Sequence, residues 1–270
     1  MNSLIGYAGG KARQAGWISG YINKINHETY VEPFSGVASV FFAKEKSQIE
    51  VLNDQNKIIY YIFKSLRDYP TEFVEFCSLI EYSEQARKGA INILFKQDNS
   101  KMEVWKLGAW ALFLIASSFS GNFLASTFGV GYTGKSSAKK WLEKHEHLKF
   151  FIDRAKEAII FNRNAIEIIN KYDRDGVVMY CDPPYHNSKY NYNCEFDHEV
   201  LAKTLHNIKS AKILLSHYYV EPYISMYKDW YVDTKDSSQS CRGNSVTSDR
   251  TGLAVVEGLW MNFKPNKDEN

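Results

Sequence analysis

An unbroken apolar run, Val177–Cys181, is followed at once by Asp-Pro-Pro-Tyr at 182–185, and this junction most constrains the fold. A short apolar run without polar alternation is typical of a strand buried on both faces, as in a parallel sheet. Two consecutive prolines end such a strand because they lack backbone N–H donors and hold the chain extended. Ligands of open α/β sheets bind beyond the carboxyl ends of the strands, so the tetrapeptide is predicted to lie at a binding site.

The tetrapeptide offers acceptors and a ring. The carboxylate of Asp182 and the carbonyl of Pro183 accept hydrogen bonds, and Tyr185 is expected to present an exposed aromatic face. Together these groups suit a planar base that carries an exocyclic amino group. Taken alone, the same residues also fit a strand that ends in a capped proline turn with no further role.

The rest of the chain alternates predicted strands and helices. Strands are predicted at 27–34, 48–52, 158–161, 176–181, 211–216 and 230–233, and helices at 35–45, 55–67, 165–172 and 196–208. A terminal hairpin is predicted around 243–249 and 252–263. The alternation predicts a doubly wound, Rossmann-like α/β sheet formed by 1–67 and 157–270. A mostly helical insertion is predicted at 68–156.

Composition narrows the class of protein. The chain has 270 residues, of which 44% are hydrophobic, enough for one α/β domain with a large insertion or for two small domains. Its net charge is only +2, so a nucleic-acid surface would have to be a local patch. Its four cysteines form no C-x-x-C pair, which predicts neither a zinc site nor a disulfide framework. With no signal peptide and no apolar run long enough for a bilayer, a cytoplasmic protein is expected.

A second candidate site is the turn after the first predicted strand. Gly36 and its small neighbours allow a ligand close to the backbone at a helix N-terminus. An acidic Glu32 in this turn argues against a pyrophosphate and for a cationic or hydroxyl-bearing ligand. Asp54, which ends the next strand, is placed to accept ribose hydroxyls. Upstream, a glycine-rich loop with Tyr7 and Lys11 is either flexible or folds over the ligand, with Lys11 on a carboxylate and Tyr7 stacking or packing.

Four motifs in order resemble the Dam-type family of DNA adenine N6-methyltransferases: Y-A-G-G-K at 7–11, V-E-P-F-S-G-V-A-S-V at 31–40, L-N-D at 52–54 and V-V-M-Y-C-D-P-P-Y at 177–185. The wide gap before D-P-P-Y matches the alpha group, whose target-recognition region lies in that gap. The resemblance implies S-adenosylmethionine as methyl donor, no metal, and double-stranded DNA with a flipped adenine as substrate. It also implies a prokaryotic or phage origin and allows a restriction-modification context with a cognate endonuclease.

The resemblance assigns roles to individual residues. The implied cofactor contacts are Tyr7, Lys11, Glu32, Phe34, Asp54 and Asp182. The implied catalytic residues, which hold the adenine, are Asp182, Pro183, Pro184 and Tyr185. The Dam pattern of an Asn-Gly hairpin followed by a base-reading arginine is missing, because F-S-G-N-F-L-A at 119–125 has no arginine. A G-A-T-C target therefore does not carry over, and Asn122 is predicted to contact a base edge.

Gly129–Ser136 matches the P-loop pattern G-x-x-x-x-G-K-[ST]. A P-loop needs a strand directly before it, and 121–128 is a poor strand. We therefore expect a basic loop on DNA phosphates, with Lys135 joined by Lys139 and Lys140. Residues 135–156 carry seven basic and three acidic side chains, 7 − 3 = +4, although a solvated helix face would look the same. A cytosine N4-methyltransferase and a P-loop ATP-binding module remain as alternative functions.

Overall fold

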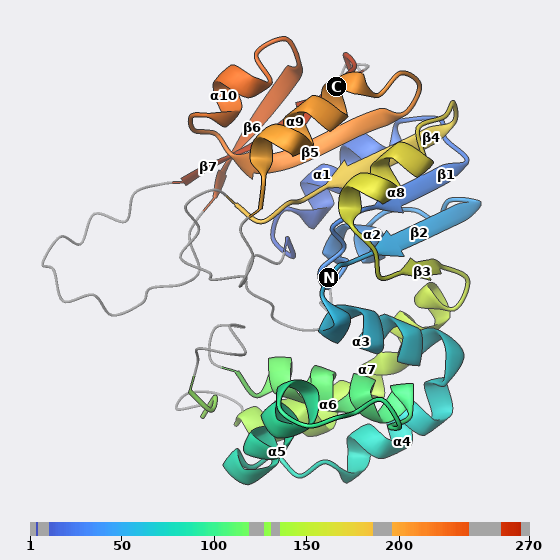
Figure 1. Ribbon diagram of the computed structural model, residues 1–270, viewed down its shortest axis with the longest axis vertical. Helices are drawn as coiled ribbons and strands as arrows, with labels where there is room; N and C mark the ends of the chain where they lie inside the picture. The colour runs from blue at the N-terminus through green and yellow to red at the C-terminus, as the bar shows by residue number, and fades with distance from the viewer. Residues whose placement is uncertain are drawn as a thin grey trace, which may run out of the picture.

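A seven-stranded sheet forms the upper part of the molecule in Figure 1, and a group of helices lies beyond its β3 edge. The computed structural model describes Leu4 and residues 11–118, 127–130, 136–185, 196–237 and 255–265. The strand order is β3-β2-β1-β4-β5-β7-β6. The strands are β1 (Thr29–Glu32), β2 (Ile49–Asn53), β3 (Ile159–Phe161), β4 (Val177–Cys181), β5 (Lys212–Tyr218), β6 (Tyr231–Ser237) and β7 (Val255–Met261).

The pairing of the strands places the candidate residues on one edge of the sheet. β1 pairs in parallel with both β2 and β4, and β2–β3 and β4–β5 are parallel as well. β7 runs antiparallel between β5 and β6. The order of the strands reverses between β1 and β4, which is the topological switch point where α/β sheets bind ligands. The turns after β1, β2 and β4 meet there.

Helices cover both faces of the sheet. Neighbouring residues such as Tyr30 and Val31 point to opposite faces, and each belongs to a separate buried apolar cluster. One face carries α1 (Ala15–Asn23), α2 (Ser39–Ala43) and α3 (Lys57–Asp68), and the other carries α8 (Ala165–Lys171), α9 (His198–Asn207) and α10 (Tyr223–Met226). In Figure 1, α8 and α9 lie in front of the sheet and α1 behind it. The predicted α/β sheet with helices on both faces is confirmed, and all five residues of β4 are buried.

The segment 68–156 is helical, as predicted, wherever the structure describes it except in short connections. Its helices are α4 (Pro70–Leu79), α5 (Glu84–Phe95), α6 (Val104–Ala116) and α7 (Ser137–Ala155). The apolar helix α6 is enclosed by α3, α4 and α5. It approaches α3 so closely that a Cβ on Gly108 would lie 2.1 Å from the Ser65 hydroxyl. At its far end, α7 is fixed to the sheet by Arg154, whose guanidinium pairs with the buried Glu50 of β2.

Two expectations about secondary structure are corrected, and the structure adds a helix. The helix α1 was not predicted, and the helix predicted from residue 35 begins only at Ser39, because residues 33–38 form a turn. The predicted terminal hairpin is wrong in its pairing: β7 pairs with β5 and β6, so both of its edges are taken. The other half of that hairpin, 243–249, lies outside the described residues. None of the helices in the described ranges combines the length and apolar composition needed to span a bilayer.

Candidate active site at the carboxyl ends of β1, β2 and β4

Asp182 is the first residue after β4, and its carboxylate is held from the neighbouring strand. The hydroxyl of Ser216 on β5 donates to Asp182 Oδ1 at 3.0 Å and lies 2.8 Å from the hydroxyl of Tyr180. The ammonium of Lys11 lies 3.3 Å from the same Oδ1. Burial raises the pKa of Asp182 to about 6, against the opposing charge of Lys11. The carboxylate is thus oriented and its pKa lies near neutral pH.

Lys11 joins Asp182 to a buried cluster that sequence reasoning missed. Its ammonium lies 2.8 Å from Oε1 of Glu257 on β7, and it also donates to the hydroxyl of Tyr185. That hydroxyl donates in turn to Glu257. Burial alone would lower the pKa of Lys11, but Asp182 and Glu257 outweigh it and raise the pKa, so Lys11 is charged. The sequence predicts Lys11 on a carboxylate without naming it, and in this structure the carboxylates beside Lys11 are those of Asp182 and Glu257.

The ring of Tyr185 is not fully exposed, contrary to expectation. It stacks on His217 with 4.3 Å between ring centres, and His217 stacks on Tyr223 at 3.6 Å. The edge of Tyr218 approaches Tyr185 at 4.6 Å. The last residues of β5, His217 and Tyr218, cover the ring, because β5 runs parallel to β4 and ends at the same edge of the sheet. The hydroxyl of Tyr185 therefore points toward Lys11 and Glu257, and its ring is partly buried.

The turn after β1 brings two further carboxylates to the same edge. Glu32, the last residue of β1, is 1% exposed and accepts a hydrogen bond of 2.6 Å from the Tyr30 hydroxyl. Burial raises the pKa of Glu32 to about 8. Asp54 accepts from the backbone N–H groups of Gly36 and Asn56, both at 2.8 Å, and burial raises its pKa to about 6. Glu32 and Asp54 follow or end adjacent strands, as the sequence predicted.

The backbone of this turn has an unusual shape. Gly36 and Ala38 both have left-handed torsions, with φ of 48° and 53°. Such a torsion is strained for a residue other than glycine, and it marks a turn whose shape serves a ligand or a tight packing contact. The hydroxyl of Ser39, next in the chain, is buried and has no hydrogen-bond partner among the described residues. A polar atom of this kind fits a site that a bound molecule completes.

Asn53 holds the strand ends together beneath this turn. Its amide nitrogen donates to the carbonyls of Pro33 and Arg163 at 2.8 and 3.0 Å, and its oxygen accepts from the Arg163 N–H at 2.9 Å. The ends of β1, β2 and β3 are therefore linked by one side chain. Phe34 lies on the other side of the turn, with its ring edge-on to Phe196 at 5.5 Å between centres.

The predicted DNA contacts are described only in part. Asn122 and Lys135 lie outside the described residues, as does Tyr7, which is predicted to contact the cofactor. Lys139 and Lys140 are exposed in the first turn of the helix α7, and their contact with DNA stays a prediction.

The basic segment 135–156 is a smaller patch than its composition suggested. Arg154 forms an ion pair with Glu50, and the ammonium of Lys144 donates to the Leu4 carbonyl at 2.7 Å. Burial lowers the pKa of Lys144 to about 8. Besides Lys139 and Lys140, the exposed basic side chains of α7 and its C-terminal cap are Lys149 and Lys156.

The described residues around Gly129 do not support the alternative of a P-loop at 129–136. Residues 127–130 make one isolated bridge, between Phe128 and Ser118, and no strand of the sheet lies among them. The N–H of Gly129 donates to the Ser117 carbonyl, and its own carbonyl accepts from the Tyr82 hydroxyl. This backbone is therefore bonded to its helical surroundings.

A comparison with known families decides between the remaining functions. The model of the D12 class N6 adenine-specific DNA methyltransferase family matches residues 7–240, which include both turns and Asp182–Tyr185. The chain belongs to this family. The protein is thus an enzyme that methylates N6 of adenine in DNA, and neither a cytosine N4-methyltransferase nor a P-loop ATP-binding module is favoured. A search of curated proteins found no match.

Methyltransferases of this family use S-adenosylmethionine, and the turn after β1 fits such a ligand. The left-handed turn at Gly36 and Ala38, the unpartnered Ser39 hydroxyl and the two buried carboxylates supply a close backbone approach and polar partners. Among the described residues, no group of three or more His, Cys, Asp or Glu side chains could hold a metal ion.

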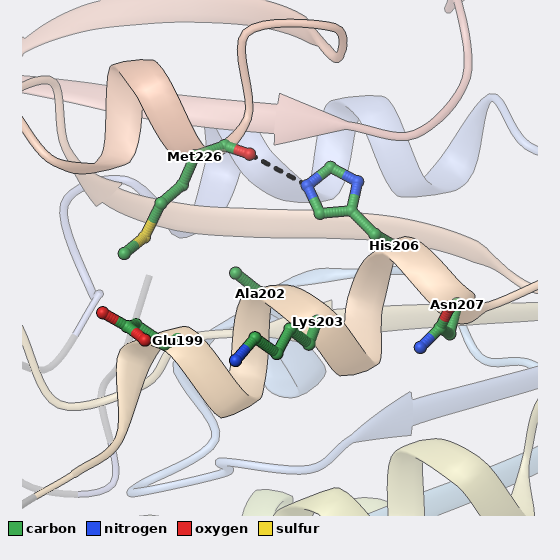
Figure 2. A pocket seen from close by; sticks show the side chains of 6 residues that line it. All are labelled: Glu199, Ala202, Lys203, His206, Asn207 and Met226. Carbon is green, nitrogen blue, oxygen red and sulfur yellow. Dashed lines mark hydrogen bonds between the residues drawn. The ribbon is translucent and has the colours of Figure 1, made fainter.

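A pocket of about 440 Å³ lies away from these strand ends, along the outer surface of α9 (Figure 2). Most of the side chains drawn in Figure 2 come from α9, and His206 donates to the Met226 carbonyl at 2.9 Å. The pocket is lined by Glu199, Ala202, Lys203, His206, Asn207 and Met226. None of these residues contributes to the cluster around Asp182, so the pocket is separate from the candidate active site.

Proposed function

We propose that the enzyme acts on an adenine turned out of duplex DNA, and that Asp182 and the Pro183 carbonyl accept the two N–H bonds of its N6 amino group. The lone pair of this nitrogen is delocalised into the ring, which makes it a poor nucleophile. Two acceptors return electron density to the nitrogen and orient it toward the methyl donor. The bond from Ser216 to Asp182 Oδ1 supports this role, because it fixes the carboxylate before the substrate arrives.

The cofactor is proposed to lie across the ends of β1 and β2. When bound, S-adenosylmethionine supplies an electrophilic methyl group on a sulfonium. Glu32 and Asp54 would take its hydroxyl and ammonium groups, and Phe34 would pack against its base. The fit of the Gly36–Ser39 turn supports this placement. Tyr7 and Lys11 are proposed to close over the ligand from the N-terminal side.

Tyr185 is proposed to contact the flipped base through its ring. Turning a base out of the duplex costs a few kcal/mol. Stacking on an aromatic ring returns roughly 1–3 kcal/mol per base. Its partial burial between His217 and Tyr218 supports a defined ring orientation, since neighbouring rings restrict its rotation. Pro184 holds the ring at a fixed distance from Asp182.

The helical segment 68–156 is proposed to be the target-recognition domain, inserted into a catalytic domain formed by 1–67 and 157–270. Exposed Lys139 and Lys140 at the start of α7 are proposed to contact DNA phosphates, together with Lys135. Asn122 is proposed to contact a base edge. The position of these helices beyond the β3 edge of the sheet supports a distinct role (Figure 1).

The observation that carries the proposal is the orientation of Asp182 at the switch point of the sheet. Asp182→Asn keeps the size of the side chain and removes its charge. We expect it to slow single-turnover methylation by about a hundredfold or more. The substrate is DNA from cells that lack adenine methylation, and the control is Asp153→Asn on the exposed surface of α7. Equal rates for Asp182→Asn and the unmodified enzyme would contradict the proposal.

A further inference from the structure

Glu257 is a charged residue within an otherwise apolar strand. It belongs to β7, opposite Tyr218 of β5 and Lys235 of β6, and only 2% of its surface is exposed. A buried carboxylate costs free energy unless it has partners. Its partners here are the ammonium of Lys11 and the hydroxyl of Tyr185. Both belong to the candidate active site, so Glu257 is tied to that site and not to the packing of the sheet alone.

Among the described residues, the charges in this cluster do not cancel. One ammonium, that of Lys11, faces two carboxylates, those of Asp182 and Glu257. The ammonium lies 2.8 Å from Glu257 and 3.3 Å from Asp182, so it is shared unequally in favour of Glu257. Without Glu257, Lys11 would pair with Asp182 alone. A carboxylate that pairs fully with an ammonium is a weaker acceptor for another hydrogen bond.

We propose that Glu257 is a positioning residue for methyl transfer: it holds Lys11 and thereby keeps Asp182 a strong hydrogen-bond acceptor for the adenine amino group. This inference rests on the proposed function of Asp182. Glu257 itself touches neither the base nor the methyl donor. It acts through Lys11, and its bond to the Tyr185 hydroxyl fixes the orientation of that ring in the same cluster.

The pH dependence of the cluster follows from this arrangement. Burial is the largest cause of the raised pKa of Asp182, and the charge of Glu257 raises it further while Lys11 opposes both. Besides Lys11, the ionisable groups that face the cluster among the described residues are Glu32 of β1, Tyr180 and Cys181 of β4, Tyr185, His217 and Tyr218 of β5, Tyr223 of α10 and Lys235 of β6. Removing the charge of Glu257 therefore lowers the pKa of Asp182. By Brønsted behaviour, the same change weakens Asp182 as an acceptor.

The decisive variant is Glu257→Gln, which keeps the shape of the side chain and removes its charge. In single-turnover methylation of DNA that lacks adenine methylation, we expect the plateau rate to fall by about tenfold and the acid limb of the pH profile to move to lower pH. Affinity for S-adenosylmethionine, measured by calorimetry without DNA, should stay within about threefold. A fall in rate with an unmoved acid limb would overturn the proposal, as would an unchanged rate.

A second readout does not depend on activity. Carboxyl ¹³C NMR titration of the protein alone, with the Asp182 signal assigned by its loss in Asp182→Asn, should show a lower pKa for Asp182 in Glu257→Gln. Lys11→Met should shift the same pKa upward, because two carboxylates then face each other without a cation. If Glu257→Gln does not fold, the direction in which Lys11→Met shifts the pKa of Asp182 decides whether the proposal holds. A downward shift or no shift would overturn the proposal.

The control is Asp233→Asn on β6, which removes a carboxylate that bonds Trp17 and Tyr21 of α1 and does not contact Lys11. It should leave the acid limb where it is. Failure of the inference is distinguishable from failure of the proposed function. If the unmodified enzyme methylates adenine and Asp182→Asn does not, while Glu257→Gln behaves as the unmodified enzyme, only the role of Glu257 is wrong.

Discussion

At the scale of single residues, the protonation state of Asp182 controls whether it can accept both a fixed hydrogen bond and the substrate. Its oxygen Oδ1 already accepts from Ser216 and faces Lys11. A protonated carboxyl would replace one acceptor by a donor aimed at an amino group. The ionised form is therefore the active one in the proposed reaction.

Methyl transfer should depend on pH through this group. Burial raises the folded pKa of Asp182 to about 6, so the ionised fraction grows as pH rises through that value and shrinks as pH falls. We expect the single-turnover rate to increase about tenfold per pH unit well below pH 6 and to level off above it. Rapid-quench measurements at constant ionic strength check this. A rate independent of pH between 5 and 7 would contradict the assignment.

The ring and the hydroxyl of Tyr185 can be tested separately. Tyr185→Ala removes the stacking surface, so we expect DNA binding or KM to weaken by about tenfold or more. Tyr185→Phe keeps the ring and loses only the bonds to Lys11 and Glu257, and Tyr185→Trp also keeps an aromatic face. Both should retain most of the activity. Fluorescence of a base analogue at the target position reports base flipping, and wild-type kinetics for Tyr185→Ala would refute stacking.

At the scale of elements, local sequence patterns predicted the strands well. The apolar run at 177–181 and the turns at Glu32 and Asp54 were found because each joins a buried strand to polar residues. The short helix α2 was placed too early, since the left-handed torsions of Gly36 and Ala38 depend on contacts with the next strand end. The helix α1 was missed, because its weakly patterned residues become helical by packing on the sheet.

Two residues of the candidate site, Ser216 and Glu257, carry a signal in the sequence. Ser216 interrupts an apolar strand at K-I-L-L-S-H-Y, and Glu257 interrupts another at V-V-E-G-L-W-M. A polar residue in a buried strand needs a partner, which is a usable signal. The identity of the partner could not be predicted, because Lys11 and Glu257 come from opposite ends of the chain.

The ion pair that attaches α7 to the sheet should contribute measurably to the free energy of unfolding. Glu50 is 4% exposed and is shared by Lys44 and Arg154. Glu50→Gln would leave two cations without their carboxylate, and breaking a buried pair from one side costs about 3–5 kcal/mol. Urea unfolding should show this loss in the free energy of unfolding. Lys46→Gln, in the exposed pair with Glu157, should leave that free energy unchanged.

The same network sets a pH dependence of stability. Burial alone would raise the pKa of Glu50, but the hydrogen bonds from Arg154 and Lys44 lower it below its ordinary value. A carboxyl whose folded pKa is depressed stabilises the fold fully above its unfolded pKa. The contribution is lost as pH falls through the folded pKa. The stabilisation by ionised Glu50 is therefore complete at neutral pH, and the variant Glu50→Gln lacks it.

The start of α7 should contact DNA phosphates. Replacing Lys135, Lys139 and Lys140 by glutamine should weaken binding to all sequences alike and reduce the salt slope by about one unit per lost contact. Affinity for S-adenosylmethionine without DNA should not change. Lys156→Gln, at the other end of the helix, is the matched control. A triple variant with an unchanged salt slope would show that these lysines are only a solvated helix face.

At the scale of the whole molecule, strand order creates the site. The reversal between β1 and β4 brings the turn after β1 beside Asp182, and the antiparallel β7 adds Glu257 from the C-terminal end. The alternation of strands and helices predicted this α/β arrangement, including the edge on which the site lies. Side-chain distances within the cluster could not be predicted, since they depend on how β5 and β7 are inserted into the sheet.

The most direct test of the central claim identifies the methylated atom. DNA that lacks adenine methylation is incubated with the enzyme and S-adenosylmethionine carrying a deuterated methyl group, then digested to nucleosides for mass spectrometry. The account predicts deuterated N6-methyladenine with the unmodified enzyme and, after the same short incubation, at least about a hundredfold less with Asp182→Asn. Label in N4-methylcytosine, no label in DNA, or equal N6-methyladenine from both proteins would contradict it.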